Sequence, residues 1–153
     1  MTESVESRLS ADMKAALRAG EEGRLRLSVI RMARAALQNA GIEKRRSLTD
    51  DEAVAVVARE VKQRRDSARE YKELGRADKA EALEVEIAVL EAYLPEQLSD
   101  AELRDLISEA IAAVGAKSRR DMGKVMGKVM PLVRGRADGQ RVNELVITLL
   151  PDQ

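Results

Sequence analysis

Apolar residues recur three and four positions apart along most of this chain, and that spacing limits the folds it can adopt. An α-helix turns once in 3.6 residues, so residues at this spacing lie on one helix face. No alternating apolar and polar pattern, of the kind that marks a half-buried strand, competes with it. The sequence therefore predicts an all-α, multihelical protein.

Residues 1–95 are predicted to form an N-terminal four-helix subdomain. Its helices are expected over residues 3–19, 24–40, 49–74 and 77–94. Gly41 is expected to end the second helix, because glycine readily adopts the left-handed conformation found at helix ends. Thr49 and Glu52 form a capping box that begins the third helix. Pro95 marks the end of the subdomain, since proline disfavours helical geometry in the residue before it.

Residues 96–153 are predicted to form a smaller, three-helix C-terminal subdomain. Ser99 and Glu102 form a second capping box, and the helix that they begin should close at Gly115. The last helix is expected to begin at Asp138 or next to it. A third helix of unusual composition lies between these two.

This middle helix is predicted within the sequence SRRDMGKVMGKVMPLVRGRAD, which runs from residue 118 to residue 138. Ser118 with Asp121 should cap it, because the two side chains have the spacing of a capping pair. Pro131 should kink the helix or end it near Met130, because proline lacks the N–H that a helix interior needs.

Gly123 and Gly127 lie inside the same predicted helix. A glycine in a helix interior costs roughly 1 kcal/mol relative to alanine, so two of them should bring some compensating advantage. We expect that advantage to be close approach of another backbone. Both glycines are therefore predicted to be helix-packing residues inside the C-terminal subdomain.

The formal net charge of zero hides an uneven distribution along the chain. Residues 1–58 carry ten Lys/Arg and nine Asp/Glu, residues 59–77 seven and four, residues 78–114 two and ten, and residues 115–153 eight and four. An acidic segment thus lies between two basic ones. It could lie against its basic neighbours or face away from them.

Positive charge is densest in the C-terminal subdomain, where it predicts contacts with phosphates. Eight basic residues occur within 25 positions beside Asp121 and Asp138, which gives a local charge of +6. These candidate phosphate ligands are Lys117, Arg119, Arg120, Lys124, Lys128, Arg134, Arg136 and Arg141. Secondary candidates on the third helix are Lys62, Arg64 and Arg65. In both places the alternative is a solvated basic rim around an ordinary core.

The composition excludes several kinds of functional site. Cys and His are absent, so there is no thiol nucleophile, no imidazole base and no thiolate or imidazole metal ligand. We expect no catalytic residue, no metal site and no cofactor. Trp and Phe are also absent, and Tyr71 and Tyr93 alone cannot form a stacking platform for single-stranded bases. Any nucleic acid would therefore be held through its phosphates and its shape.

The first 14 residues, MTESVESRLSADMK, are polar and acidic. They have neither the basic region nor the apolar core of a signal peptide. No apolar run approaches the roughly 18 residues of a membrane span. We therefore expect a cytoplasmic protein with no membrane partner.

Four runs of sequence carry a resemblance to a known family. They are IRMARAALQNAGIEKR at residues 30–45, EVKQRRDSA at 60–68, LEAYLPEQLSDAEL at 90–103 and DMGKVMGKVMPLVRGRADGQRVNELV at 121–146. Through these runs the chain resembles the GatB/YqeY family over nearly its full length. In that family the unit occurs free-standing and, largely as its second half, as the C-terminal tail of the B subunit of the glutamine-dependent aspartyl/glutamyl-tRNA amidotransferase. The resemblance implies a helical tRNA-binding appendage.

The same resemblance separates binding from catalysis. The chemistry of the amidotransferase B subunit belongs to a large upstream domain, and none of that domain is found in these 153 residues. What the resemblance implies is a non-catalytic module that binds tRNA or another structured RNA. A carbon-nitrogen ligase activity with glutamine as amido-N-donor would be a label inherited from the family.

A protein–protein adaptor is the alternative from a different class. The acidic segment from Asp78 to Glu109, or the long third helix, would then dock onto a component of the amidotransferase, a tRNA synthetase or another protein.

Overall fold

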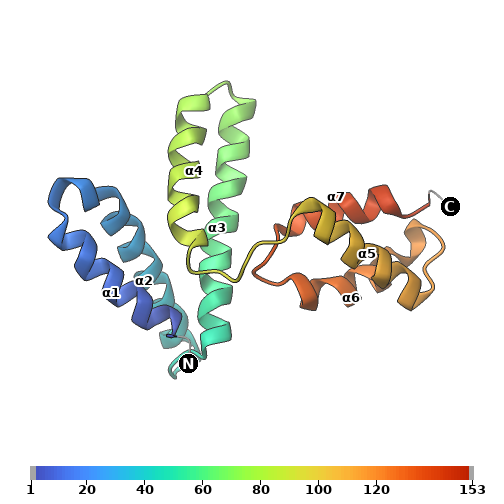
Figure 1. Cartoon of the computed structure of the whole chain (residues 1–153), viewed down its shortest axis with the longest axis horizontal. Coiled ribbons are helices and arrows are strands. Elements are labelled where there is room, and N and C mark those ends of the chain that lie inside the picture. The colour runs from blue at the N-terminus through green and yellow to red at the C-terminus, as the bar shows by residue number, and fades with distance from the viewer. Residues whose placement is uncertain (1–2, 152–153) are drawn as a thin grey trace. The chain divides into compact units, whose positions relative to one another are not determined.

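The computed structural model describes residues 3–151, and within that range the chain is helical and contains no β-strand (Figure 1). The prediction of an all-α fold is confirmed. The helices are α1 (Val5–Arg18), α2 (Arg24–Lys44), α3 (Asp50–Glu73), α4 (Ala77–Glu91), α5 (Asp100–Val114), α6 (Met122–Val133) and α7 (Gly139–Leu149). Short 3-10 turns at Gly20–Gly23 and Arg119–Asp121 precede α2 and α6.

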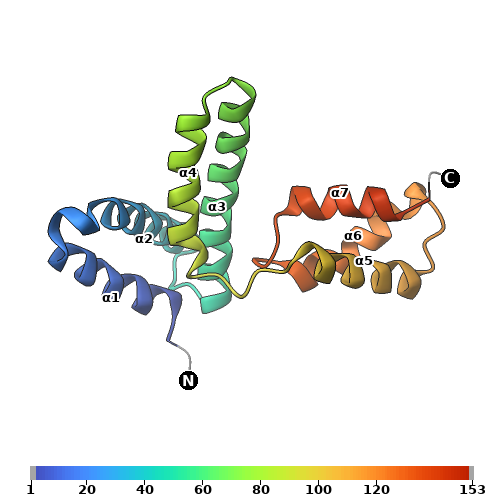
Figure 2. The ribbon, with the colours of Figure 1, turned by 45° about the horizontal axis from the view of Figure 1, so that its top comes forward.

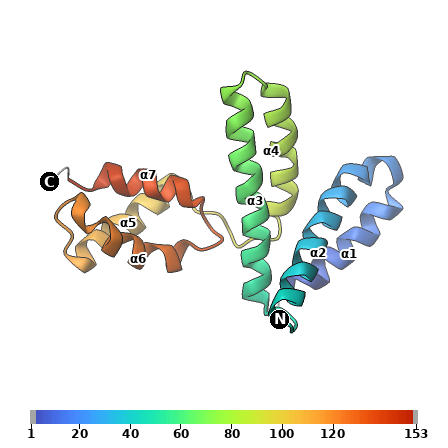
Figure 3. The ribbon, with the colours of Figure 1, turned by 180° about the vertical axis from the view of Figure 1, so that it is seen from behind.

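The chain divides into two compact units between Pro95 and Glu96. Unit 1 contains α1 to α4, and unit 2 contains α5 to α7. In unit 1, α1 lies beside α2 and α3 lies beside α4 in every view (Figure 1, Figure 2 and Figure 3). In unit 2, each of the three helices contacts the other two. Each unit buries its own cluster of apolar side chains.

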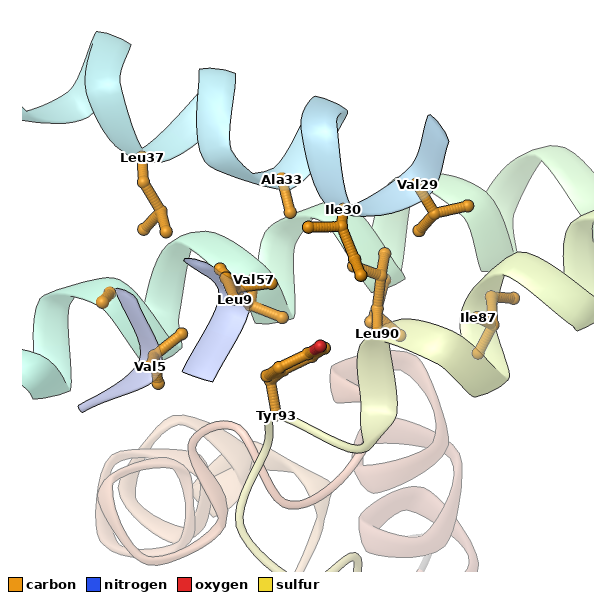
Figure 4. Packing of buried hydrophobic residues seen from close by; sticks show 12 residues of the cluster. Val5, Leu9, Val29, Ile30, Ala33, Leu37, Val57, Ile87, Leu90 and Tyr93 are labelled. Carbon is orange, nitrogen blue, oxygen red and sulfur yellow. The ribbon is translucent and has the colours of Figure 1, made fainter. Parts of the chain in front are cut away.

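One cluster of aliphatic side chains joins the four helices of unit 1 (Figure 4). Leu9 of α1, Ile30 of α2, Val57 of α3 and Leu90 of α4 are all fully buried in it. Tyr93, which follows α4, is the one aromatic member of this cluster. The core therefore depends on one amphipathic face from each helix, as the apolar spacing predicts.

Tyr93 connects the end of α4 to α1. Its hydroxyl donates a hydrogen bond to the carboxylate of Asp12, and the guanidinium of Arg8 lies 5.0 Å from the centre of its ring. Arg8 also donates to the carbonyl of Ala92 at 2.6 Å. Burial, and then the hydrogen bond to Asp12, raises the pKa of Tyr93 to about 12. The fold thus favours the neutral phenol.

The turn between α1 and α2 needs a glycine at one position. An ideal Cβ at Gly23 would lie 2.2 Å from the carbonyl oxygen of Ala16. The backbone of the turn therefore approaches α1 more closely than a side chain permits. Gly20, in the same turn, has a φ of +64° but has open space around its Cα.

The prediction that Gly41 ends α2 is wrong. The helix continues to Lys44, and Arg45 instead adopts the left-handed conformation, with a φ of 59°. The N–H groups of Arg45 and Arg46 donate to the carbonyls of Ile42 and Gly41, which closes the helix in the manner usual for a glycine cap. A Cβ at Gly41 would lie 3.4 Å from the carbonyl oxygen of Arg46, which is an ordinary van der Waals distance.

The predicted starts of three other helices are confirmed. Thr49 and Glu52 form a reciprocal capping box at α3, and Ser99 and Glu102 form one at α5. Asp138 caps α7 by accepting a hydrogen bond from the N–H of Gln140 at 3.2 Å. These caps use side chains within three residues of each other, which explains why the sequence alone could predict them.

In unit 2, α6 buries Val125, Val129 and Val133 in a core shared with α5 and α7. The prediction that Pro131 could end this helix near Met130 is wrong, because α6 runs through Pro131 to Val133. Proline removes one helical hydrogen bond, but the buried valines on either side keep the last turn in place.

The prediction that Gly123 and Gly127 serve helix packing is also wrong. An ideal Cβ at either position would meet no described atom within 4 Å, and both residues are exposed. At 100° per residue, Gly123 lies about 160° around α6 from Val125, and Gly127 lies as far from Val129. The glycines are therefore on the side of α6 that faces away from the core of unit 2.

Within residues 3–151, no helix is both long enough and apolar enough to cross a membrane.

Two glycine substitutions should have opposite effects on stability. Gly23→Ala should lower the free energy of unfolding by about 1–3 kcal/mol, because its Cβ would overlap the Ala16 carbonyl. Gly127→Ala should raise it by about 0.5–1 kcal/mol, because alanine favours the helix and its Cβ enters open space. Urea denaturation followed by circular dichroism measures both. Equal effects of the two changes would contradict the structure.

The stability of unit 1 should depend on pH in the alkaline range through Tyr93. Its pKa is raised in the folded protein, so its contribution is complete below the ordinary value of 10.0 and is lost as pH rises through about 12. The difference in unfolding free energy between wild type and Tyr93→Phe should therefore narrow over that range, by up to about 2–3 kcal/mol. Urea denaturation at a series of pH values measures it, and parallel pH profiles would count against the burial of Tyr93.

Candidate nucleic-acid interface

The approach to α6 is fixed by two local hydrogen bonds. Ser118 Oγ accepts from the N–H of Arg120 at 3.3 Å, so Ser118 caps the 3-10 turn before α6. The prediction that Ser118 caps α6 itself is wrong. Asp121 Oδ2 accepts from the backbone N–H of Lys117 at 2.9 Å. This hydrogen bond, followed by the charge of Lys124, holds the pKa of Asp121 below its usual range. Asp121 is therefore ionised, and its carboxylate is already hydrogen-bonded to the backbone of Lys117.

Five of the eight predicted phosphate ligands have exposed side chains that form no ion pair or hydrogen bond with the part of the chain that the structure describes. These five, which we call the basic row, are Lys117, Arg120, Lys124, Lys128 and Arg134. Lys124 and Lys128 are one turn apart on α6, about 6 Å along the helix axis. Arg120 lies in the turn before α6 and Arg134 directly follows its end. The basic row thus follows α6 from one end to the other.

Arg141 is not available in the same way. Its guanidinium forms two hydrogen bonds with the carboxylate of Asp100, at 3.2 and 2.6 Å, and a third with Glu144 at 3.2 Å. The pair holds the pKa of Asp100 below its usual range and raises that of Arg141. Arg141 therefore joins the start of α5 to α7, and its role as a phosphate ligand stays a prediction.

Arg136 also serves the fold of unit 2. Its Nε donates to the carbonyl of Glu96 at 3.2 Å, and its own carbonyl accepts from the N–H of Leu98 at 2.8 Å. Gln97 adds a third bond between the same two segments, to the carbonyl of Gly135. The loop after α6 is thus held against the segment before α5. Arg119 is exposed, and its backbone N–H donates to the carbonyl of Pro151.

The secondary candidates on α3 have structural partners. The side chain of Arg64 is only 8% exposed and reaches Glu86 at 3.1 Å and the Glu60 carboxylate at 3.3 Å. A phosphate could not reach it, so that prediction is wrong. Lys62 is exposed and pairs with Asp66 one turn further along α3.

The acidic segment explains these pairings. Arg65 of α3 contacts Glu91 of α4 at 2.5 Å, and Lys72 of α3 contacts Glu84 of α4 at 2.8 Å. Together with the pair between Arg64 and Glu86, these contacts run along the α3–α4 hairpin. The sequence shows a basic segment next to an acidic one, but it does not show whether their side chains form ion pairs. In α4 they do.

The exposed side of α6 combines charge with a lack of side chains. Gly123, Gly127 and Pro131 follow one another at four-residue spacing, and Lys124 and Lys128 lie next to them on the same exposed side. A long, negatively charged molecule could therefore come close to the α6 backbone while lysines contact it. Among the described residues no group of three or more carboxylates could hold a metal ion.

Sequence comparison agrees with the fold. A family model described as Yqey-like protein matches residues 6–150. The chain belongs to the YqeY-like family. The resemblance inferred from the sequence runs is confirmed at this level.

Two curated proteins are similar to the YqeY-like chain. Altered inheritance of mitochondria protein 41, mitochondrial, from Pyrenophora tritici-repentis is 28% identical over 142 residues, which cover 91% of this chain and 77% of that protein. The E subunit of glutamyl-tRNA(Gln) amidotransferase from Methanopyrus kandleri is 72% identical over 25 residues, which are 16% of this chain and 4% of that protein. The second similarity is strong but short.

Removal of Arg64 should destabilise unit 1 far more than removal of Lys62. Arg64→Ala leaves two carboxylates without their buried partner and should cost about 3–5 kcal/mol. Lys62→Ala breaks an exposed pair on one helix and should cost about 0.5 kcal/mol or less. Urea denaturation of the two variants tests the assignment, and a stable Arg64→Ala protein would contradict it.

Proposed function

We propose that this YqeY-like chain is a non-catalytic RNA-binding module, and that unit 2 binds tRNA or another structured RNA through its phosphates. The observation that carries the proposal is the basic row, five exposed cations along α6 whose side chains form no ion pair or hydrogen bond with the described residues. Lysine and arginine side chains without an internal ion pair can contact phosphates, and such contacts supply most of the affinity of proteins for nucleic acids. The short similarity to part of a tRNA-dependent amidotransferase supports the choice of tRNA.

The shape of the surface favours a folded RNA over a single strand. Both tyrosines lie in unit 1, and Tyr93 is buried there, so unit 2 has no aromatic ring for stacking bases. Lysine and arginine contacts to phosphates need no such ring. We therefore expect little dependence on base sequence and strong dependence on RNA shape and salt.

A cytoplasmic location stays part of this proposal. The name of the Pyrenophora relative assigns that protein to mitochondria, and a fluorescent fusion of the present chain found there would contradict a cytoplasmic location.

The test of RNA binding is the salt dependence of tRNA affinity. Each phosphate contact contributes about 0.7–0.9 to the slope of log affinity against log salt concentration. Lys124→Ala with Lys128→Ala should therefore reduce that slope by about 1.5 and weaken binding. Fluorescence anisotropy with labelled tRNA at a series of salt concentrations gives the slope.

A matched control removes equal charge elsewhere. Lys14 and Lys79 are exposed lysines of unit 1 whose side chains form no ion pair with the described residues. Lys14→Ala with Lys79→Ala should leave the slope near that of the wild type. An unchanged slope in the Lys124 and Lys128 variant would overturn the proposal. So would a protein that fails to bind tRNA at low salt and instead retains a protein partner at high salt, as an adaptor would.

A further inference from the structure

The backbone of α6 has a missing hydrogen bond on its exposed side. In an α-helix the N–H of each residue donates to the carbonyl four positions earlier. Pro131 lies inside α6 and has no N–H, so the carbonyl of Gly127 lacks its helical donor. Both residues are exposed, and the proline ring pushes against that carbonyl and turns it toward solvent.

The side of α6 that carries Gly127 is open and positively charged. An ideal Cβ at Gly127, or at Gly123 one turn earlier, would meet no described atom within 4 Å. Lys124 and Lys128 are exposed on the same side of the helix and belong to the basic row. A ligand held by these lysines could thus come close to the α6 backbone at Gly127, where the helix has no side chain.

A carbonyl oxygen can only accept a hydrogen bond, so the ligand must supply a donor next to its phosphates. The ribose 2′-hydroxyl is such a donor, and in double-stranded A-form RNA it is displayed along a wide, shallow minor groove. DNA lacks this hydroxyl. The carbonyl, the side of α6 without side chains at Gly123 and Gly127, and the flanking lysines therefore match an RNA duplex in particular.

We infer that the Gly127 carbonyl, freed by Pro131, accepts a hydrogen bond from a ribose 2′-hydroxyl and makes unit 2 selective for RNA duplexes over duplexes without that group. This inference rests on the proposed RNA-binding function and adds the contact that distinguishes RNA. The lysines of the basic row supply affinity, and the carbonyl supplies the distinction between sugars. Because Gly123 and Gly127 have no side chain, the sugar can reach the α6 backbone there.

The test compares an RNA hairpin duplex with a 2′-fluoro duplex of the same sequence. The 2′-fluoro duplex keeps the A-form shape and the phosphates, but it has no 2′-hydroxyl donor. Wild type should bind the RNA roughly 3–10-fold more tightly, the effect of one neutral hydrogen bond. Fluorescence anisotropy competition measures this ratio directly.

Pro131→Ala restores an N–H that can bond to the Gly127 carbonyl within the helix. In this variant the ratio of affinities should fall to about 1, and α6 should become more stable. Lys124→Ala with Lys128→Ala should weaken binding of both duplexes but keep the ratio. Gly127→Ala should weaken RNA binding although it stabilises the helix, because its methyl group would lie between the RNA and the α6 backbone.

Equal affinity of wild type for the two duplexes would overturn the role of the carbonyl and leave phosphate binding standing. A ratio that persists in Pro131→Ala would overturn it as well, because the preference would then come from another contact. Failure of wild type to bind either duplex would overturn the RNA-binding proposal itself, and this inference with it.

Discussion

Ion pairs between α3 and α4 hold the hairpin of unit 1 together and occupy half of the basic residues of α3. Arg64, Arg65 and Lys72 of α3 each contact a glutamate of α4, and the innermost of them is nearly inaccessible to solvent. Buried pairs of this kind are costly to break, since each partner would remain as an isolated charge. The basic character of α3 is thus largely used inside unit 1. In unit 2, by contrast, the side chains of the basic row form no ion pair with the described residues.

This division explains why net charge says so little about the molecule. The total is zero, but the pairing is local. Three glutamates of α4 pair with basic residues in the second half of α3, and Asp100 and Glu144 pair with Arg141. The five cations of the basic row have no such ion pair with the described residues. A surface of that kind exerts a local field that the sum over the chain does not reveal.

The sequence predicted most of the fold because most of the determinants are local. Amphipathic spacing located every helix, and capping boxes such as Thr49 with Glu52 involve residues three apart. The errors occur where distant contacts override a local preference. Gly41 did not end α2 because the chain reverses after Lys44 with Arg45 in the left-handed conformation, and Pro131 did not end α6 because the valines around it are buried. Helix propensity is a weak signal when burial opposes it.

The candidate site was less predictable for the same reason. All members of the basic row were recognisable as basic residues, but the sequence could not show which neighbours were already occupied. Arg141 forms hydrogen bonds with Asp100, which is 41 residues away in the sequence, and Arg136 donates to the carbonyl of Glu96, which is 40 residues away. The helical repeat did contain one signal that was not used. At 100° per residue, Gly123 and Gly127 lie opposite Val125 and Val129, which already argues against their burial.

The composition of α6 differs between the side that faces the core and the side that is exposed. Two glycines and a proline among its 12 residues oppose the helix by about 1 kcal/mol for each glycine and up to about 3 kcal/mol for the proline. Three fully buried valines on the other side each contribute about 1.5–3 kcal/mol, which is enough to hold the helix. Burial of the valines therefore offsets the free-energy cost of the glycines and the proline on the exposed side. Alanine at the two glycine positions would make the helix more stable, and under the proposed function it would also place a methyl group between the RNA and the α6 backbone.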